Sequence, residues 1–222
     1  MSKLGDILCV SKEKEEKVKY EIIENFLRQD DLDYFDSFIK TLQPKVDSPT
    51  SFYGRKSWPS EQNTLPREKI LELEKNYVPI AMDILGRLAP HKRDLVEDVT
   101  FNLQSTPPNV SYPIHLDSNQ KVLSGVVYLK PQSSTGTYLH KNIDDHKGKE
   151  IPWAVNRAFF FSRTPNDSWH SYKGDGVGFR WVLVFNLLTF SLRKHDISDL
   201  GMMRYVQRRM FQKLNLGIEK AN

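Results

Sequence analysis

Four residues of types that bind metals and anions, His115, Asp117, His170 and Arg180, indicate where chemistry could occur in this chain. His115 and Asp117 are two positions apart in Tyr-Pro-Ile-His-Leu-Asp, so on an extended strand both side chains leave the same face. His170 lies in Ser-Trp-His-Ser-Tyr, and Arg180 follows it at the start of an apolar run. Two imidazoles and one carboxylate occupy half of a metal's coordination sphere. We therefore expect a metal site with open positions and a fixed cation nearby.

The context of these residues strengthens the metal hypothesis. A His-x-Asp triplet alone could arise by chance in a chain with 6 histidines and 28 acidic residues. Here the triplet ends a strand-like run at a turn, and the later histidine has aromatic neighbours. An arginine within an apolar strand needs an anion, because a buried cation is rarely left unpaired. The ligand set is typical of non-haem Fe(II) oxygenases, and the arginine would suit a cosubstrate with a carboxylate.

Two alternatives remain open. His115 and His170 could be core histidines with satisfied hydrogen bonds, and Arg180 could pair with an internal acid. A second group of possible metal ligands lies in a charged, turn-forming stretch, which favours a solvated loop. It comprises His140, Asp144, Asp145 and His146.

From about residue 96 onward, short β-branched and aromatic runs alternate with Gly, Pro, Asn, Asp and Ser. These runs predict strands near 97–104, 111–117, 122–130, 136–140, 155–162, 168–172 and 179–190. Short strands in succession, with no helix between them, indicate an antiparallel sandwich or barrel. The runs at 126–129, 158–161 and 181–188 are apolar on both faces, so we expect them to be covered on both sides.

The N-terminal part of the chain predicts a strand at 18–23 and two helices. The first helix would begin at Asp30 or Asp31 and end at Pro44, with an apolar stripe of Leu32, Phe35, Phe38, Ile39 and Leu42. The second would begin near Thr64 and Pro66, break or kink at Pro79, and end before Pro90.

The segment 44–64, between these helices, is polar and rich in turn residues, yet it contains Phe52, Tyr53 and Trp58. A long loop in a compact domain is often functional, so the segment could cover a substrate as a lid. Alternatively, its aromatic side chains hold it against the core. The stretch 141–153, with Trp153, is also expected to border the entrance to a site.

A final amphipathic helix is predicted after Phe190, beginning at Asp196 or Ser198 and ending near Asn215 and Gly217. Its buried stripe would comprise Leu200, Met203, Val206, Met210 and Leu214. Basic residues outnumber acidic ones here, which indicates either a solvated face or attraction to an acidic partner such as nucleic acid. They are Arg193, Lys194, Arg204, Arg208, Arg209, Lys213 and Lys220.

The bulk properties of the 222-residue chain favour a folded protein of the cytoplasm. The net charge is +4, and the mean hydropathy of -0.54 indicates a charged surface. Cys9 is the single cysteine, which excludes an intrachain disulfide and a zinc cluster built from cysteines. No apolar run approaches the ~18 residues that cross a bilayer, so we expect no membrane partner.

The run from Tyr112 through Leu129, together with the residues around His170 and Arg180, closely resembles the 2-oxoglutarate- and Fe(II)-dependent oxygenases, most nearly their prolyl-4-hydroxylase-like branch. The resemblance covers about residues 96–190. It implies a mainly β fold with flanking helices, a double-stranded β-helix or cupin-like jelly-roll barrel. The expected layout is an N-terminal strand and helices at 1–95, the catalytic core at 96–190 and the amphipathic helix at 191–222, all in one structural domain.

The resemblance also implies roles for individual residues. His115, Asp117 and His170 would bind Fe(II), and Arg180 would pair with the distal carboxylate of 2-oxoglutarate. Tyr128 matches a position where the branch often uses tyrosine to hydrogen-bond that carboxylate.

Further residues match the branch less closely. Tyr112 matches a position near the site, and Asn102 could reach the metal end of the cosubstrate. The sequence departs from some relatives at Val182, where they have a hydroxyl. Asn186 stands where the nucleic-acid demethylase branch has a second arginine, which argues against a nucleic-acid substrate.

The expected function is hydroxylation with dioxygen as oxidant, on a small-molecule or peptide substrate. A peptidyl proline or an amino-acid-like molecule is the first expectation from the resemblance. Two alternatives belong to other classes. One is a metal-binding cupin-like barrel or small-molecule-binding module without oxygenase activity. The other is an interaction protein that acts through its basic C-terminal helix.

Overall fold

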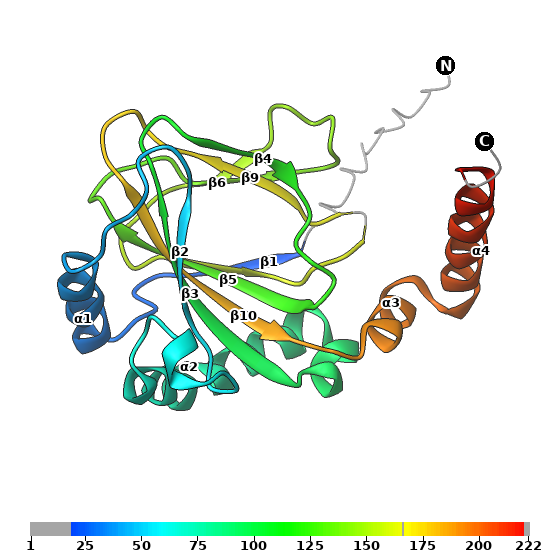
Figure 1. Ribbon diagram of the computed structural model, residues 1–222, viewed down its shortest axis with the longest axis horizontal. Coiled ribbons are helices and arrows are strands. Elements are labelled where there is room, and N and C mark those ends of the chain that lie inside the picture. Colours follow the sequence, from blue (N-terminus) through cyan, green and yellow to red (C-terminus); the bar gives the residue numbers. More distant parts are fainter. Residues whose placement is uncertain (1–18, 166, 220–222) are drawn as a thin grey trace, which may run out of the picture.

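The strands form two antiparallel sheets that face each other (Figure 1). The computed structural model describes residues 19–165 and 167–219, with side chains described as far as residue 210. The larger sheet has the order β1 (Tyr20–Ile23), β8 (Ala158–Phe161), β5 (Lys121–Lys130), β10 (Arg180–Leu188), β3 (Asp98–Thr106), β2 (Thr50–Gly54). The smaller sheet has the order β4 (Ser111–His115), β9 (Trp169–Lys173), β6 (Thr137–His140), β7 (Lys149–Ile151).

This arrangement confirms the predicted antiparallel, mainly β architecture with flanking helices. Each predicted strand region contains a strand, with ends that differ by a few residues. The strands β2 and β7 were not predicted, because both lie in polar stretches and form by pairing with β3 and β6.

The segment 44–64 contributes β2 and a short 3-10 helix, η1 (Ser60–Gln62). Phe52 of β2 stacks on Trp181 of β10, with ring centroids 5.9 Å apart. Tyr53 packs against Trp58 and also lines a cavity that lies between the two sheets. The aromatic side chains thus attach this segment to the sheet, and β2 forms one wall of the cavity.

Two helices, α1 (Gln29–Ile39) and α2 (Arg67–Leu88), cover the outer face of the larger sheet (Figure 1). The predicted caps were wrong: Arg28 and Pro66 precede the helices, without side-chain capping bonds. Of the break or kink predicted at Pro79, the break is absent, since α2 runs through this residue. Pro79 lies on the exposed side of the helix, where water can bond the carbonyl that loses its helical donor.

Apolar side chains pack on both faces of the larger sheet, as the sequence predicted. On β10, Leu183 and Phe185 face the helices, whereas Val182 faces the barrel interior. On β8, Phe160 faces the helices and Phe159 faces inward. The helices therefore allow the sheet to be apolar outside and to carry selected polar groups inside.

The C-terminal region differs from the prediction. The 3-10 helix η2 (Pro90–Leu95) contacts α3 (Leu192–Leu200), and a separate helix α4 (Met202–Glu219) follows. Gly201 divides α3 from α4 at a φ of +74°, a conformation that favours glycine.

The predicted buried stripe of the last helix was wrong for Met203, Val206 and Met210, which are exposed, whereas Leu200 is half-buried in α3. Met203 is 80% and Met210 61% exposed, because α4 extends away from the sheets (Figure 1). Leu214 lies outside the described side chains, as do Lys213, Asn215 and Gly217, while Cys9 and Lys220 lie outside the described residues. Within the described chain, no helix is long and apolar enough to cross a membrane.

A buried charge cluster joins the two sheet-covering helices and yields a stability prediction. Asp31 is fully buried and accepts hydrogen bonds from Lys69 and Tyr77. Burial raises the pKa of Asp31, but these bonds outweigh it and hold the pKa below the ordinary carboxyl value. Asp31→Asn removes the buried counter-ion of the Lys69 ammonium and leaves it only the half-exposed Glu72 at 3.1 Å, so we expect unfolding in urea near pH 7 to require about 3 kcal/mol less.

The pH dependence of this loss provides a check. Because the folded-state pKa is depressed, the stabilisation is complete above the ordinary carboxyl value of 3.8 and is lost as pH falls through the folded-state pKa. The difference between wild type and Asp31→Asn should therefore shrink in strong acid. Asp30→Asn, at the exposed neighbouring position, is the matched control and should leave stability almost unchanged. Equal losses in both variants would contradict the role of the buried pair.

Candidate metal centre

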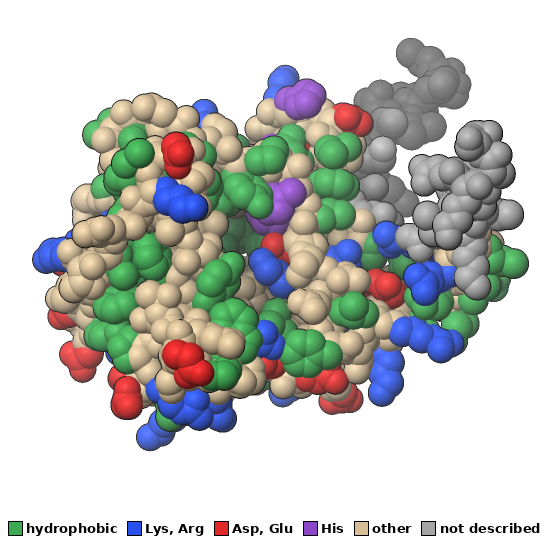
Figure 2. All heavy atoms as spheres, in the orientation of Figure 1, with side chains coloured by type: hydrophobic (Ala, Val, Ile, Leu, Met, Phe, Trp, Pro, Cys, Tyr) green, Lys and Arg blue, Asp and Glu red, His purple; other side chains and the backbone are tan. Residues whose placement is uncertain are grey.

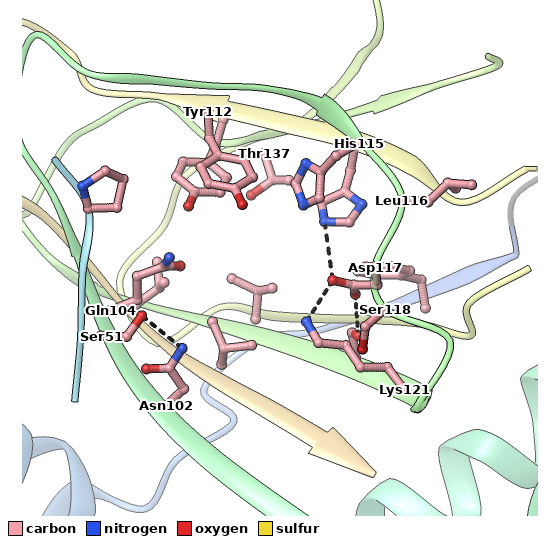
Figure 3. Close-up of a pocket in the computed structure, with 18 of the residues that line it drawn as sticks. Ser51, Asn102, Gln104, Tyr112, His115, Leu116, Asp117, Ser118, Lys121 and Thr137 are labelled. Carbon is pink, nitrogen blue, oxygen red and sulfur yellow. Dashed lines mark hydrogen bonds and ion pairs between the residues drawn. The ribbon is translucent and has the colours of Figure 1, made fainter. Parts of the chain in front are cut away.

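His115 and His170 are brought together by the pairing of β4 with β9. The two residues lie opposite each other in the strand register, and their ring centroids are 4.2 Å apart. Asp117 follows in the loop after β4, with one carboxylate oxygen 4.0 Å from Nε2 of His170. One ligand atom from each of these three residues lies within 4.8 Å of the others. The three side chains thus form a group that could hold one metal ion. Figure 3 labels two of them, His115 and Asp117.

Each imidazole is held in a tautomer that suits a metal ligand. Nδ1 of His115 bonds the carbonyl of Pro113 at 3.0 Å, and Nδ1 of His170 bonds the carbonyl of Ser168 at 3.0 Å. Because a carbonyl only accepts, both Nδ1 atoms carry a proton, and in the neutral form of each ring Nε2 then holds the lone pair that can bind a metal. Hydrogen bonds of this kind orient histidine ligands in metal sites.

Neighbouring charges and burial keep Asp117 and His170 in the protonation states that bind a metal. Burial raises the pKa of Asp117, but the Lys121 ammonium and its hydrogen bond, together with His170 and Ser124, lower it to about 2. Lys121 Nζ donates to Oδ1 at 2.6 Å, and Ser124 Oγ donates to Oδ2 at 2.6 Å. Burial is the main reason that the pKa of His170 falls to about 4. At neutral pH the carboxylate is therefore ionised and the His170 ring is neutral.

Arg180, at the start of β10, is a buried cation. It is 1% exposed, and its Nη2 donates to Thr137 Oγ1 at 3.0 Å. Its guanidinium lies over the rings of Tyr128, Trp153 and Tyr172, at 4.8 to 5.5 Å from their centroids. Burial lowers the pKa of Arg180, and among the described residues no carboxylate pairs with it. The alternative in which Arg180 pairs with an internal acid therefore has no support in the described structure.

One cavity of about 480 Å³ contains both the possible metal ligands and Arg180. The alternation of strand side chains explains its lining, since residues two apart share a face. Arg180, Val182 and Val184 of β10 all line it, as do His170 and Tyr172 of β9. Figure 2 shows the surface hollowed between the two sheets, with a histidine side chain at the edge of the hollow.

The other predicted site residues differ in their placement. Asn102 and Tyr112 line the cavity (Figure 3), and Tyr112 stacks on Tyr172 at 5.0 Å. Tyr128 lies deeper and is not among the lining residues. Its hydroxyl donates to the carbonyl of Ile151 at 3.1 Å and accepts from the backbone N–H of Thr137 at 2.9 Å. To reach a ligand in the cavity, Tyr128 would have to give up one of these bonds.

Sequence reasoning missed several lining residues: Gln104, Lys121, Thr137 and Tyr172. Tyr172 was detectable, because it lies two positions after His170 and therefore on the same strand face. Lys121 carried a weaker signal, four positions after Asp117. Gln104 and Thr137 became visible only through sheet pairing, where Thr137 lies opposite Tyr172.

The competing cluster at 140–146 forms no metal-binding group in the described structure. Nδ1 of His140 bonds the carbonyl of Asp145, and its Nε2 bonds Ser171 Oγ at 2.8 Å. His146 and Asp144 are exposed in the loop. The solvated-loop interpretation of this stretch therefore agrees with the structure.

Comparison with known proteins identifies the fold. No protein-family model and no curated protein sequence matches the chain. Among solved structures, it is similar to a prolyl-4-hydroxylase of Pseudomonas putida, with a TM-score of 0.55 and 12% identity over 78% of this chain and 94% of that one. A prolyl hydroxylase of Trichoplax adhaerens, in complex with a hypoxia-inducible-factor peptide, also gives a TM-score of 0.55 and 12% identity, over 78% of this chain and 85% of that one.

A 2-oxoglutarate-Fe(II) oxygenase-family protein of Burkholderia pseudomallei gives a TM-score of 0.53 and 14% identity, over 76% of this chain and 84% of that one. These structural neighbours are 2-oxoglutarate- and Fe(II)-dependent oxygenases, which share the double-stranded β-helix. The chain therefore has the fold that its sequence resemblance implied. At these identities the likeness establishes the fold alone.

Metal binding can be tested without any assumption about a reaction. We expect the metal-free protein to bind one Co(II), used as a coloured probe, and His115→Ala or Asp117→Ala to weaken that binding at least tenfold. Visible absorption during the titration measures the affinity. His146→Ala, in the exposed loop, is the control and should bind as wild type does. Unchanged affinity in both ligand variants would show that the metal binds elsewhere.

Proposed function

We propose that this protein is an Fe(II)- and 2-oxoglutarate-dependent dioxygenase that hydroxylates a small-molecule or peptide substrate. One observation carries the proposal: the His115, Asp117 and His170 group and the unpaired guanidinium of Arg180 line the same cavity. A metal-binding barrel without this activity needs no buried cation facing its ligand site. The oxygenase fold, found independently of these side chains, supports the same conclusion.

In this proposal His115, Asp117 and His170 hold the Fe(II) ion. With 2-oxoglutarate bound, the iron would supply the activation of dioxygen that hydroxylation requires. Arg180 binds the far carboxylate of 2-oxoglutarate, because a planar guanidinium forms charge-assisted bonds to a carboxylate. The aromatic rings around Arg180 shield this pair from water, which strengthens the attraction.

Two further residues hold Arg180 in place. Thr137 accepts a hydrogen bond from Arg180, and its own backbone N–H donates to the hydroxyl of Tyr128. Tyr128 therefore acts on the guanidinium through Thr137, and its ring also lies against the guanidinium. Asn102 and Tyr112 border the space where the cosubstrate and substrate meet.

A peptide or an amino-acid-like molecule is the proposed substrate, with a prolyl residue as the first candidate. The cavity opens between β2 and β4, where Tyr53 is 43% and Tyr112 37% exposed. Flat aromatic side chains at a mouth suit contact with a peptide or a ring. Two of the structural neighbours are prolyl hydroxylases, and one was solved with a peptide.

The activity is tested by coupled turnover. We expect succinate to form only when Fe(II), 2-oxoglutarate and dioxygen are all present, and to form faster with a proline-containing peptide than with free proline. Mass spectrometry should show one added oxygen atom in the peptide. If the protein binds Co(II) tightly but neither binds 2-oxoglutarate nor forms succinate, the non-oxygenase barrel is correct instead.

The role of Arg180 is tested by Arg180→Lys, which keeps the charge but loses the planar pair of donors. We expect the affinity for 2-oxoglutarate, measured by anaerobic calorimetry with Fe(II) present, to fall about tenfold or more, a loss of about 1.4 kcal/mol. Metal affinity should not change. Arg87→Lys, at an exposed helix position paired with Glu21, is the matched control. Unaltered 2-oxoglutarate affinity in Arg180→Lys would remove Arg180 from the proposed site.

A further inference from the structure

The loop that begins at Asp117 is held by residues that lie far along the chain. Three of its backbone carbonyls accept hydrogen bonds from outside the loop. Arg163 Nε donates to the carbonyl of Asp117 at 3.2 Å, and His195 Nδ1 donates to the carbonyl of Asn119 at 2.8 Å. The backbone N–H of Thr189 donates to the carbonyl of Gln120 at 2.8 Å.

The donors are buried, whereas the loop itself lies near the surface. His195 and Thr189 are fully buried and Arg163 is 7% exposed, while Ser118 and Gln120 are exposed. A surface loop of this kind would ordinarily be mobile. Here it is fixed from its inner side, and its first residue is one of the proposed metal ligands.

A buried ion pair in turn fixes the helix that carries His195. Asp199, in the same helix α3, pairs with Lys92 of η2 at 2.7 Å, and both side chains are almost fully buried. Lys92 also donates to the carbonyl of Arg163 at 2.5 Å. The same ammonium thus anchors both α3 and the residue that holds Asp117. These contacts lie outside the cavity, and the proposed chemistry does not use them.

We propose that His195 and Arg163 are positioning residues of the metal centre, so that the first C-terminal helix, α3, forms part of the support of the iron site. The inference rests on the proposed function, because it assumes that Asp117 is a metal ligand. Neither residue touches the cavity. They act by fixing the backbone from which the Asp117 side chain projects toward His115 and His170.

The effect of such support on metal affinity is substantial. Loss of an outer hydrogen-bond partner commonly weakens metal binding by about 10- to 100-fold, because the ligand then samples orientations that do not bind. The bonds here are to the ligand's own backbone and to the carbonyl two residues on. We therefore expect an effect at the lower end of this range, about tenfold for each residue.

The experiment measures Co(II) affinity in variants that separate positioning from general stability. His195→Leu fills similar space but removes the donor. His195→Asn keeps an N–H donor near the place of Nδ1 and should restore binding. Arg163→Met removes the donor to Asp117 and gives an independent test if His195→Leu does not fold. Tyr77→Phe, which loses a buried hydrogen bond to Asp31 in the helical layer, is the control for stability loss alone.

We expect His195→Leu and Arg163→Met to bind Co(II) about tenfold more weakly than wild type, with His195→Asn close to wild type. Tyr77→Phe should lower the melting temperature but leave Co(II) affinity unchanged. Wild-type affinity in the folded His195→Leu or Arg163→Met variant overturns the role of that residue. An equal loss in Tyr77→Phe would assign the effect to stability alone. Failure of the wild-type protein to bind Co(II) would contradict the proposed function itself, which is a different result.

Discussion

The guanidinium of Arg180, buried without an acidic partner, is the constraint on which the interior of this protein depends. Moving a cation from water into a barrel is unfavourable unless other groups replace its hydration. Three aromatic faces and the Thr137 hydroxyl replace part of it. None of these groups carries a negative charge, so the positive charge of Arg180 is neutralised only when an anion enters the cavity. In the proposed function, a carboxylate of 2-oxoglutarate neutralises this charge.

The interior can carry such a group because the same strands are stabilised from outside. On β10, Leu183 and Phe185 pack under the helices, while the alternate positions of the strand face the cavity. On the face of the larger sheet that packs against the helices, the side chains leave no spare space. A Cβ atom on Gly125 of β5 would lie 2.2 Å from the ring of Phe160, so only glycine fits there. The apolar face thus offsets the cost of a polar and charged interior.

Part of the site was predictable from residue spacing, although Asp117 lies in the loop after β4 and not on the strand that its spacing suggested. The spacing of His115 and Asp117 indicated a common face, and the aromatic context of His170 indicated a second strand. Their convergence depends on the β4–β9 register, which the sequence did not specify. β2 was missed because Thr-Ser-Phe-Tyr-Gly becomes a strand only by pairing with β3.

The C-terminal region shows the limits of sequence patterns. The spacing of Met203, Val206 and Met210 correctly indicated a helix, since these residues lie within α4. Periodicity does not show whether anything packs against such a stripe, and here the stripe is exposed. Gly201 was a detectable signal for the end of α3, because glycine favours the left-handed backbone that closes a helix. The bond from His195 to Asn119 carried no such signal, because it joins distant segments through a backbone carbonyl.

The charges of the cavity relate metal binding to anion binding. The lining contains the carboxylate of Asp117 together with the cations of Lys121 and Arg180. Lys121 bonds the Asp117 oxygen that faces His170, so its ammonium holds the carboxylate in place and also opposes a nearby divalent ion. A dianion in the same cavity would offset this repulsion, and the divalent ion would in turn favour the dianion. In the proposed function, Fe(II) and 2-oxoglutarate therefore strengthen each other's binding through the field of the cavity, in addition to any direct contact.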